Sequence, residues 1–234
     1  MSRFVLSALS TLGAIVAIGF APLAIAQDAD GHAHAEGETH AHSKTDAPMP
    51  EGVFSEVAGD HAIGEKAAPV TLIVFASVTC PHCAVWFKED YPVIKRDYVD
   101  TDKLRLVFRE FPTAPAQVAV AGFLIAACGS DEDYFPAIEY QMAHQEQTLE
   151  ALIAGDIKET FDGLGEQSGL NPEQVEACLA DKDGFDALNE TVARARAAGL
   201  KGVPSMMING VVYPGKDVSA SALSTVIDAL IASK

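Results

Sequence analysis

A strand pattern that runs directly into two closely spaced cysteines constrains this chain more than any other feature. Residues 70–75, Val-Thr-Leu-Ile-Val-Phe, are apolar and rich in β-branched side chains, as in a core strand of a parallel sheet. The motif Cys80-Pro81-His82-Cys83 follows, and the apolar residues after it recur at helical spacing. The sequence therefore predicts that the cysteines lie where a strand's C-terminal end meets the N-terminus of a helix.

This predicted position favours redox chemistry at Cys80. Unpaired backbone N–H groups and the helix dipole stabilise a thiolate at a helix N-terminus. Pro81 suits the first turn, where its missing N–H costs nothing, and His82 adds a donor beside the sulfur. Half of a zinc site and an inert loop are the alternatives, but no second Cys or His pair stands nearby at ligand spacing. We predict that Cys80 and Cys83 form a redox pair and that the site holds no metal.

The charge balance argues against one class of partner. The chain has 234 residues, enough for one sizeable domain plus appendages. It carries 33 acidic and 16 basic residues, a net charge of −17, and has no basic cluster that could neutralise phosphates. We therefore expect no nucleic-acid binding.

Residues 1–26 have the organisation of a secretory signal peptide. Arg3 precedes an apolar stretch over 5–20, and Ala24-Ile25-Ala26 forms a small-residue cleavage site. A retained membrane anchor is the alternative, but the apolar core is short for a spanning helix. We predict export to the periplasm, where disulfides persist.

Residues 27–52 contain few bulky apolar side chains, which predicts a disordered linker. Its histidines could collect Cu²⁺ or Zn²⁺, although a solvated spacer is the simpler interpretation. These histidines are His32, His34, His40 and His42. The predicted domain covers 53–234, and its first stretch, 53–57, is expected to be an edge strand.

The remaining sequence predicts an α/β domain with a long helical insertion. Residues 103–111 indicate a second central strand, and Pro92 should kink the helix that precedes it. A strand–helix–strand unit of this length implies a parallel crossover. A helical block at about 115–199 follows, in which Asn171 is the expected N-cap of one helix. Its predicted helices are 116–128, 133–144, 149–154, 157–164, 172–179 and 185–198.

Sheet signals return near the end of the chain. Residues 202–213 contain two apolar runs separated by Asn209-Gly210, which predicts a two-residue hairpin. A final helix is expected over 219–232.

Three motifs resemble the DsbA-like thiol–disulfide oxidoreductases of the thioredoxin superfamily. The tetrapeptide at 80–83 is similar to their active site, and residues 108–112 (Phe-Arg-Glu-Phe-Pro) to the strand end that follows the redox helix. Residues 202–205 (Gly-Val-Pro-Ser) resemble the loop that carries a cis-proline opposite the active site. The resemblance covers about 58–231 and implies a thioredoxin fold with an inserted helical subdomain.

The resemblance also implies roles for individual residues. Cys80 would be the exposed nucleophile and Cys83 its buried partner, and a substrate thiolate would attack Cys80 in the oxidised pair. Pro204 would take the cis bond, which leaves the Val203 backbone available to an extended substrate. An ordinary trans proline is the alternative.

The chain departs from the family pattern at two positions. Val74 stands where many members carry a buried Glu beneath the motif, and Val78 where an aromatic residue is common. The proton acceptor for Cys83 is therefore left open, with water and Glu110 as candidates.

Cys128 and Cys178 lie in the predicted insertion, 50 positions apart. In an exported protein they predict a structural disulfide. Two buried free thiols and a second redox pair are the alternatives.

The resemblance implies a monomeric periplasmic enzyme that introduces disulfides into unfolded or reduced exported polypeptides through Cys80–Cys83. It would pass its electrons to a quinone-linked membrane reoxidase and need no bound cofactor. One alternative is a reductase or isomerase kept reduced by a membrane partner, which usually needs a dimerisation module. Another is a copper-handling periplasmic protein that uses the His-rich linker.

Overall fold

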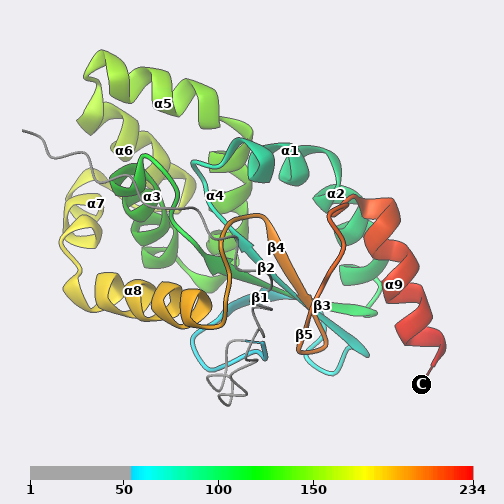
Figure 1. Cartoon of the computed structure of the whole chain (residues 1–234). Helices are drawn as coiled ribbons and strands as arrows, with labels where there is room; N and C mark the ends of the chain where they lie inside the picture. Colours follow the sequence, from blue (N-terminus) through cyan, green and yellow to red (C-terminus); the bar gives the residue numbers. More distant parts are fainter. Residues whose placement is uncertain (1–53, 234) are drawn as a thin grey trace, which may run out of the picture. The chain divides into compact units, whose positions relative to one another are not determined.

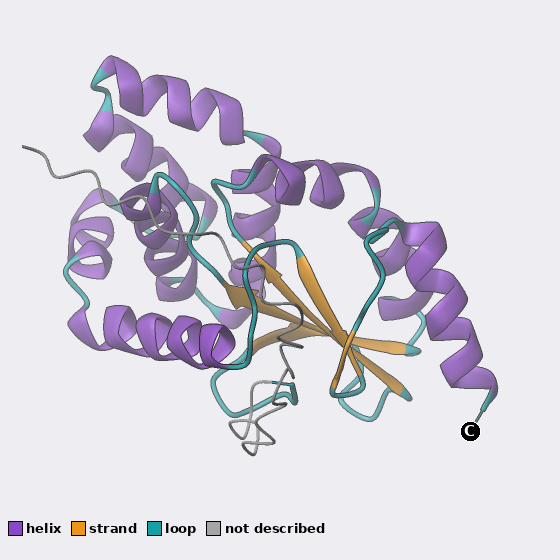
Figure 2. Ribbon diagram, viewed as in Figure 1, coloured by secondary structure: helices purple, strands orange, loops and turns teal. Residues whose placement is uncertain are grey.

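The computed structural model describes residues 54–233, and the predicted signal peptide (1–26) and His-rich linker (27–52) lie outside them. Within these residues five strands form one mixed sheet in the order β1-β3-β2-β4-β5. Figure 1 shows this sheet at the centre of the domain, and Figure 2 shows the helices that surround it. The strands are β1 His61–Ile63, β2 Val70–Ala76, β3 Leu104–Glu110, β4 Ser205–Ile208 and β5 Val211–Val212.

The two central strands run parallel, as predicted. β2 pairs with β3 from Val70↔Leu104 to Ala76↔Glu110, and β4 pairs with the other side of β2 in antiparallel orientation. Because β2 has neighbours on both sides and all but one of its side chains are buried, its continuous apolar run is explained. β4 and β5 form the predicted hairpin, in which Asn209 and Gly210 take φ values of 49° and 80°.

The prediction of an edge strand over 53–57 is wrong for the described residues. Residues 54–57 form no strand, and the antiparallel neighbour of β3 is β1. Two arginines of β3 bind the segment that precedes β1. Arg105 pairs with Glu56 at 2.9 Å, and Arg109 pairs with Asp60 at 2.6 Å. Ion pairs and not a strand ladder therefore fix this segment to the sheet.

The helix after Cys80 is interrupted, as Pro92 predicts. α1 spans Pro81–Glu89, α2 spans Tyr91–Ile94, and a π-helical turn follows over Lys95–Val99. Pro92 falls in the first turn of α2, where its missing N–H costs least. Asp90 at the break accepts a hydrogen bond from the N–H of Ala220 at 2.7 Å, which links α1 to the C-terminal helix α9, Ala220–Ala232.

Six helices lie between β3 and β4 in the described chain, where the insertion was predicted. Three begin two to four residues earlier than expected, two of them because Ser130 and Asp181 accept hydrogen bonds as N-caps. Asn171 caps α7 in a complete capping box with Gln174, as predicted. The helices are α3 Ala116–Cys128, α4 Asp131–Ala143, α5 Gln145–Ala154, α6 Ile157–Gln167, α7 Pro172–Leu179 and α8 Lys182–Ala197.

One hydrophobic core joins the sheet to the insertion. Aromatic side chains from α1, β3, α3 and α4 pack together there, and both active-site cysteines belong to the same cluster. In Figure 1 the insertion, green to yellow, lies on one side of the sheet, and α9, in red, lies at the other. Inside the insertion a disulfide joins Cys128 of α3 to Cys178 of α7. No helix within residues 54–233 is long and apolar enough to cross a membrane.

Candidate active site

Cys80 and Cys83 lie at the junction that the sequence predicts. Cys80 is the N-cap of α1, with an extended backbone (φ −91°, ψ 117°), and Pro81 takes the first helical position. Cys83 lies one turn further along and has no exposed surface. Both cysteines are free thiols in this structure. The strand end, the tight turn and the helix start therefore put two sulfurs at one helix terminus.

The prediction that Cys80 is exposed needs correction. Only 6% of its surface is accessible, against 0% for Cys83. The loop before β4 covers it: the Cys80 thiol donates a hydrogen bond to the carbonyl of Val203 at 3.6 Å. The peptide bond between Val203 and Pro204 is cis, as the resemblance implies. The two cysteines therefore differ little in solvent exposure: Cys80 keeps a small accessible area, and Cys83 has none.

The surroundings of the two sulfurs shift their pKa values in opposite directions. The hydrogen bond from the Cys83 thiol, supported by the backbone N–H groups of Cys83 and His82, lowers the pKa of Cys80 from 9.0 to about 6 despite its burial. The exposed His82 adds a smaller electrostatic contribution of the same sign. The pKa of Cys83 is raised, first because its thiol proton is held in the hydrogen bond to the Cys80 thiolate, and second because burial disfavours a charge on Cys83. The reduced pair therefore holds one thiolate at Cys80 and one thiol at Cys83.

Hydroxyl groups that the sequence did not single out fix the loop before Cys80. The Ser77 hydroxyl accepts hydrogen bonds from the backbone N–H groups of Thr79 (3.3 Å) and Thr113 (3.1 Å). The Thr79 hydroxyl donates to the carbonyl of Thr113 at 3.0 Å. These bonds join the β2–α1 loop to the β3–α3 loop. The Ser-x-Thr spacing before a helix is a local signal for such bonds, but the partner Thr113 has none.

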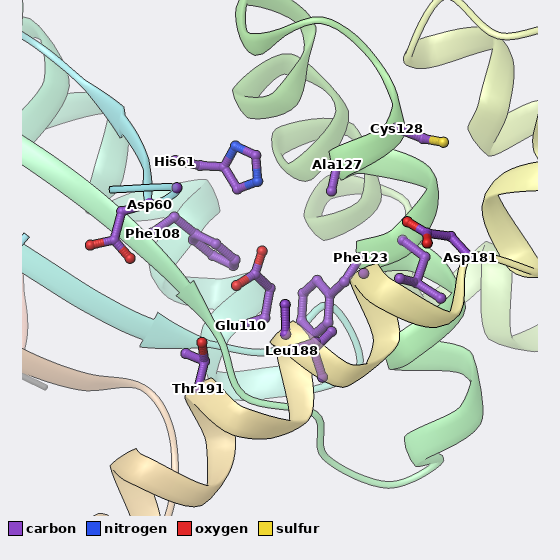
Figure 3. A pocket seen from close by; sticks show the side chains of 14 residues that line it. Asp60, His61, Phe108, Glu110, Phe123, Ala127, Cys128, Asp181, Leu188 and Thr191 are labelled. Atoms are coloured by element: carbon purple, nitrogen blue, oxygen red, sulfur yellow. The ribbon is translucent and has the colours of Figure 1, made fainter. Parts of the chain in front are cut away.

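Glu110 is not placed to serve Cys83. Its carboxylate accepts a hydrogen bond from the Tyr134 hydroxyl at 2.6 Å, and it faces a cavity of about 190 Å³ that neither Cys80 nor Cys83 lines. Figure 3 shows Glu110 and His61 directed into this cavity. The His61 ring stacks on the Tyr134 ring, with 3.5 Å between the ring centroids. Val74 is fully buried in the core, so valine fills the position of the family's acid.

An open groove of about 520 Å³ lies against Val203, whose carbonyl accepts the hydrogen bond from Cys80, although Cys80 itself does not line the groove. Its walls come from the start of α1, from Val203 and Pro204, and from the loop before α9. Val85 is 53% exposed on the α1 side, and the Trp86 indole N–H donates to the carbonyl of Val218 at 2.7 Å, which ties the walls together. The groove can hold an extended chain along Val203 and Pro204.

No group of three or more potential metal ligands occurs within the described residues. The linker histidines lie outside that part of the chain.

Comparisons with known proteins agree with this geometry. A family model described as Thioredoxin matches residues 56–229. A Rickettsia typhi protein named as a protein-disulfide oxidoreductase is 30% identical over 153 residues, which are 65% of this chain and 55% of that protein. A Bacillus cereus protein named as disulfide bond formation protein D is 28% identical over 162 residues, or 64% of this chain and 70% of that one. This chain thus matches little more than half the length of the Rickettsia relative.

Solved structures share the fold. Wolbachia pipientis alpha-DsbA1 superposes with a TM-score of 0.63 at 24% identity, covering 76% of this chain and 94% of that one. Oxidised BdbD from Bacillus subtilis gives a TM-score of 0.63 at 15% identity, and the match covers 75% of this chain and 95% of that one. These matches confirm the predicted fold class, a thioredoxin fold with helices beyond its core.

Proposed function

We propose a dithiol-oxidase function on one premise: the chain belongs to the thioredoxin family and is a DsbA-like member of that superfamily. Oxidised Cys80–Cys83 accepts two electrons from a pair of substrate thiols and leaves a disulfide in the substrate. The observation that carries this proposal is the placement of Cys80 among the N-terminal N–H groups of α1, with Cys83 fully buried behind it.

The reaction has two exchange steps. A substrate thiolate attacks the Cys80 sulfur, the Cys80–Cys83 bond breaks, and Cys83 leaves and takes up a proton because its pKa is raised. The second substrate thiolate then attacks the substrate sulfur of the mixed disulfide. Cys80 leaves as a thiolate that the helix terminus stabilises. The substrate loses two electrons and two protons, and the enzyme gains both electrons and keeps one proton.

Exported polypeptides are the substrates that fit the site. The groove lined by Val203 and Pro204 is open and partly apolar, so an extended chain can lie along these residues, and Val203 in turn contacts the Cys80 sulfur. With the signal peptide predicted over 1–26, these substrates support our proposal that the enzyme acts in the periplasm. A quinone-linked membrane reoxidase would restore the disulfide, and we propose that the protein acts as a monomer.

Substitution of each active-site cysteine tests the assignment. Cys80→Ser should abolish oxidation of a dithiol peptide. Cys83→Ser, offered a single-cysteine peptide that carries a glutathione disulfide, should release glutathione and retain a persistent mixed disulfide between Cys80 and the peptide. The two variants control each other because each removes one thiol of the same pair. Mass spectrometry of the trapped adducts measures the outcome. Equal alkylation rates of the two thiols in the reduced wild-type protein would contradict the assigned roles.

The direction of electron flow needs a separate measurement. Stabilisation of the Cys80 thiolate favours the reduced enzyme, and therefore an oxidase over a reductase or isomerase. Equilibration with glutathione redox buffers gives the potential. We expect the active-site pair to be more oxidising than glutathione, and a pair more reducing than glutathione would favour the reductase interpretation.

A further inference from the structure

One side chain of the helical insertion reaches the active-site loop. Gln145, the first residue of α5, donates from Nε2 to the carbonyl oxygen of Val78 at 2.7 Å and to that of Cys80 at 3.2 Å. Figure 1 shows α5 beginning next to the loop that leads from β2 into α1. The contact spans 65 residues of sequence to Cys80.

The chemistry of the contact fixes the orientation of the amide. Both partners are backbone carbonyls, which can only accept, so the NH₂ group of Gln145 must face them. Gln145 is buried, with 9% of its surface exposed, and Val78 has 5%. The space that Val78, Thr79, Gln141 and Gln145 enclose is only about 10 Å³, at the lower limit for one water molecule. A replacement side chain of the same volume therefore leaves room for one water molecule at most.

The Cys80 carbonyl links the Gln145 amide to the start of α1, where the Cys80 sulfur lies. The Cys80 carbonyl already accepts the first helical hydrogen bond, from the Ala84 N–H at 3.1 Å, so its direction is coupled to the start of α1. The Cys83 thiol, and after it the backbone N–H groups of Cys83 and His82 in the same turn, stabilise the Cys80 thiolate. A carbonyl dipole beside that thiolate would disfavour it unless a donor offsets the oxygen's partial charge.

We propose that Gln145 is a positioning residue for the redox site, which holds the Val78 and Cys80 carbonyls so that the Cys80 sulfur stays among the N–H groups of α1. The helical insertion thereby takes part in setting the reactivity of the cysteine pair. This inference rests on the proposed function, because it concerns the same thiolate.

A purely structural role for Gln145 is the competing explanation, and Gln141 offers a matched control. Gln141 lies four residues earlier, is 4% exposed, and donates from Nε2 to the carbonyl of Gly122 at 3.0 Å within the insertion. Gln145→Met and Gln141→Met each remove one buried amide and keep the length of the side chain. Only the first removes a bond to the active-site loop.

The test is titration of the Cys80 thiolate by its absorbance at 240 nm in reduced protein, together with equilibration against glutathione. We expect Gln145→Met to raise the pKa of Cys80 by about one unit and to weaken the oxidant about tenfold in equilibrium constant. Gln141→Met should leave both values unchanged, and thermal unfolding should show comparable losses for the two variants. If Gln145→Met does not fold, Gln145→Asn, whose amide is one methylene too short to reach both carbonyls, should show the same direction.

A Gln145 variant that folds, melts lower and keeps the wild-type thiolate titration would overturn the proposal and leave only a structural bond. The titration needs no polypeptide substrate, so its result is independent of the dithiol-oxidase assay. Failure of the wild-type enzyme to oxidise dithiols would contradict the proposed function without moving the titration.

Discussion

The relative stability of the reduced and oxidised proteins should reverse between pH 5.5 and pH 8.5. A disulfide usually stabilises a fold, but here its reduction releases a thiolate that the fold itself stabilises. The pKa of Cys80 falls from 9.0 to about 6 on folding. A group whose pKa is lowered stabilises the fold fully above pH 9, and this contribution is lost as the pH falls through 6.

The sizes of the two opposing effects can be compared. With about 1.4 kcal/mol for each pKa unit, the thiolate stabilises the reduced fold by well under about 1 kcal/mol at pH 5.5 and by about 1 kcal/mol at pH 7. At pH 8.5 it contributes about 3 kcal/mol, after a small loss because Cys83 ionises more readily in the unfolded chain. Closing the four-residue loop stabilises the oxidised protein by about 1.9 kcal/mol at every pH. The stabilities of the two forms therefore cross between about pH 7 and pH 8.

Paired melting curves of the two forms at pH 5.5, 7.4 and 8.5 test the reversal. For a domain of this size 1 kcal/mol corresponds to about 2–4 °C, so the oxidised form should melt about 3–7 °C higher at pH 5.5. At pH 8.5 the reduced form should melt about 2–4 °C higher. Reduced Cys80→Ser is the control, because its deficit relative to reduced wild type should grow with pH as the thiolate contribution does.

Both forms must keep Cys128–Cys178 closed, which peptide mapping of the alkylated samples verifies. An oxidised protein that melts higher by the same margin at all three pH values would refute the reasoning. So would a Cys80→Ser deficit that does not change with pH, because no thiolate would then be stabilised by the fold.

Two further changes have predictable sizes. Asp60→Asn should lower the free energy of unfolding by about 3–5 kcal/mol, because it removes the charge from the carboxylate that pairs at 2.6 Å with the buried Arg109, 4% exposed. Urea unfolding measures this, and a loss below about 1 kcal/mol would contradict it. Replacing Cys128 and Cys178 together by alanine should cost about 4 kcal/mol, from the loss of a 50-residue loop closure. The urea midpoint should fall while the thiolate titration of Cys80 stays the same, and an unchanged midpoint would show that the bridge does not stabilise the fold.

The parts of the fold that could be predicted have strong local signals. Residues 70–75 could be predicted as a buried strand because the run is short and apolar and four of its six residues are β-branched. Asn209-Gly210 fixes the hairpin because both residues tolerate positive φ. β1 was missed because it has only three residues, all half-buried, and alternation over three residues gives no usable pattern.

The site could be predicted only as far as it is local. Cys80, His82 and Cys83 belong to one turn, so strand and helix patterns placed them together. Thr113 and Gln145 reach the same loop from distant segments, and each contributes an ordinary polar side chain that could equally face solvent. The covering of Cys80 by Val203 likewise follows from how the chain packs, which is why its exposure was overestimated.

Valine at position 74 changes the charge balance of the proposed reaction and does not block it. Burial, Cys80 and the backbone N–H of Ser77 are the main influences on the pKa of Cys83, and none of them is a carboxylate. A buried acid beneath the motif would add a second negative charge close to the Cys80 thiolate, and like charges disfavour each other. With valine there, the reduced site carries one charge, held by the N–H groups of α1. The proton count closes without a carboxylate, because the two substrate thiols give up two protons, the leaving Cys83 takes up one, and the other passes to solvent.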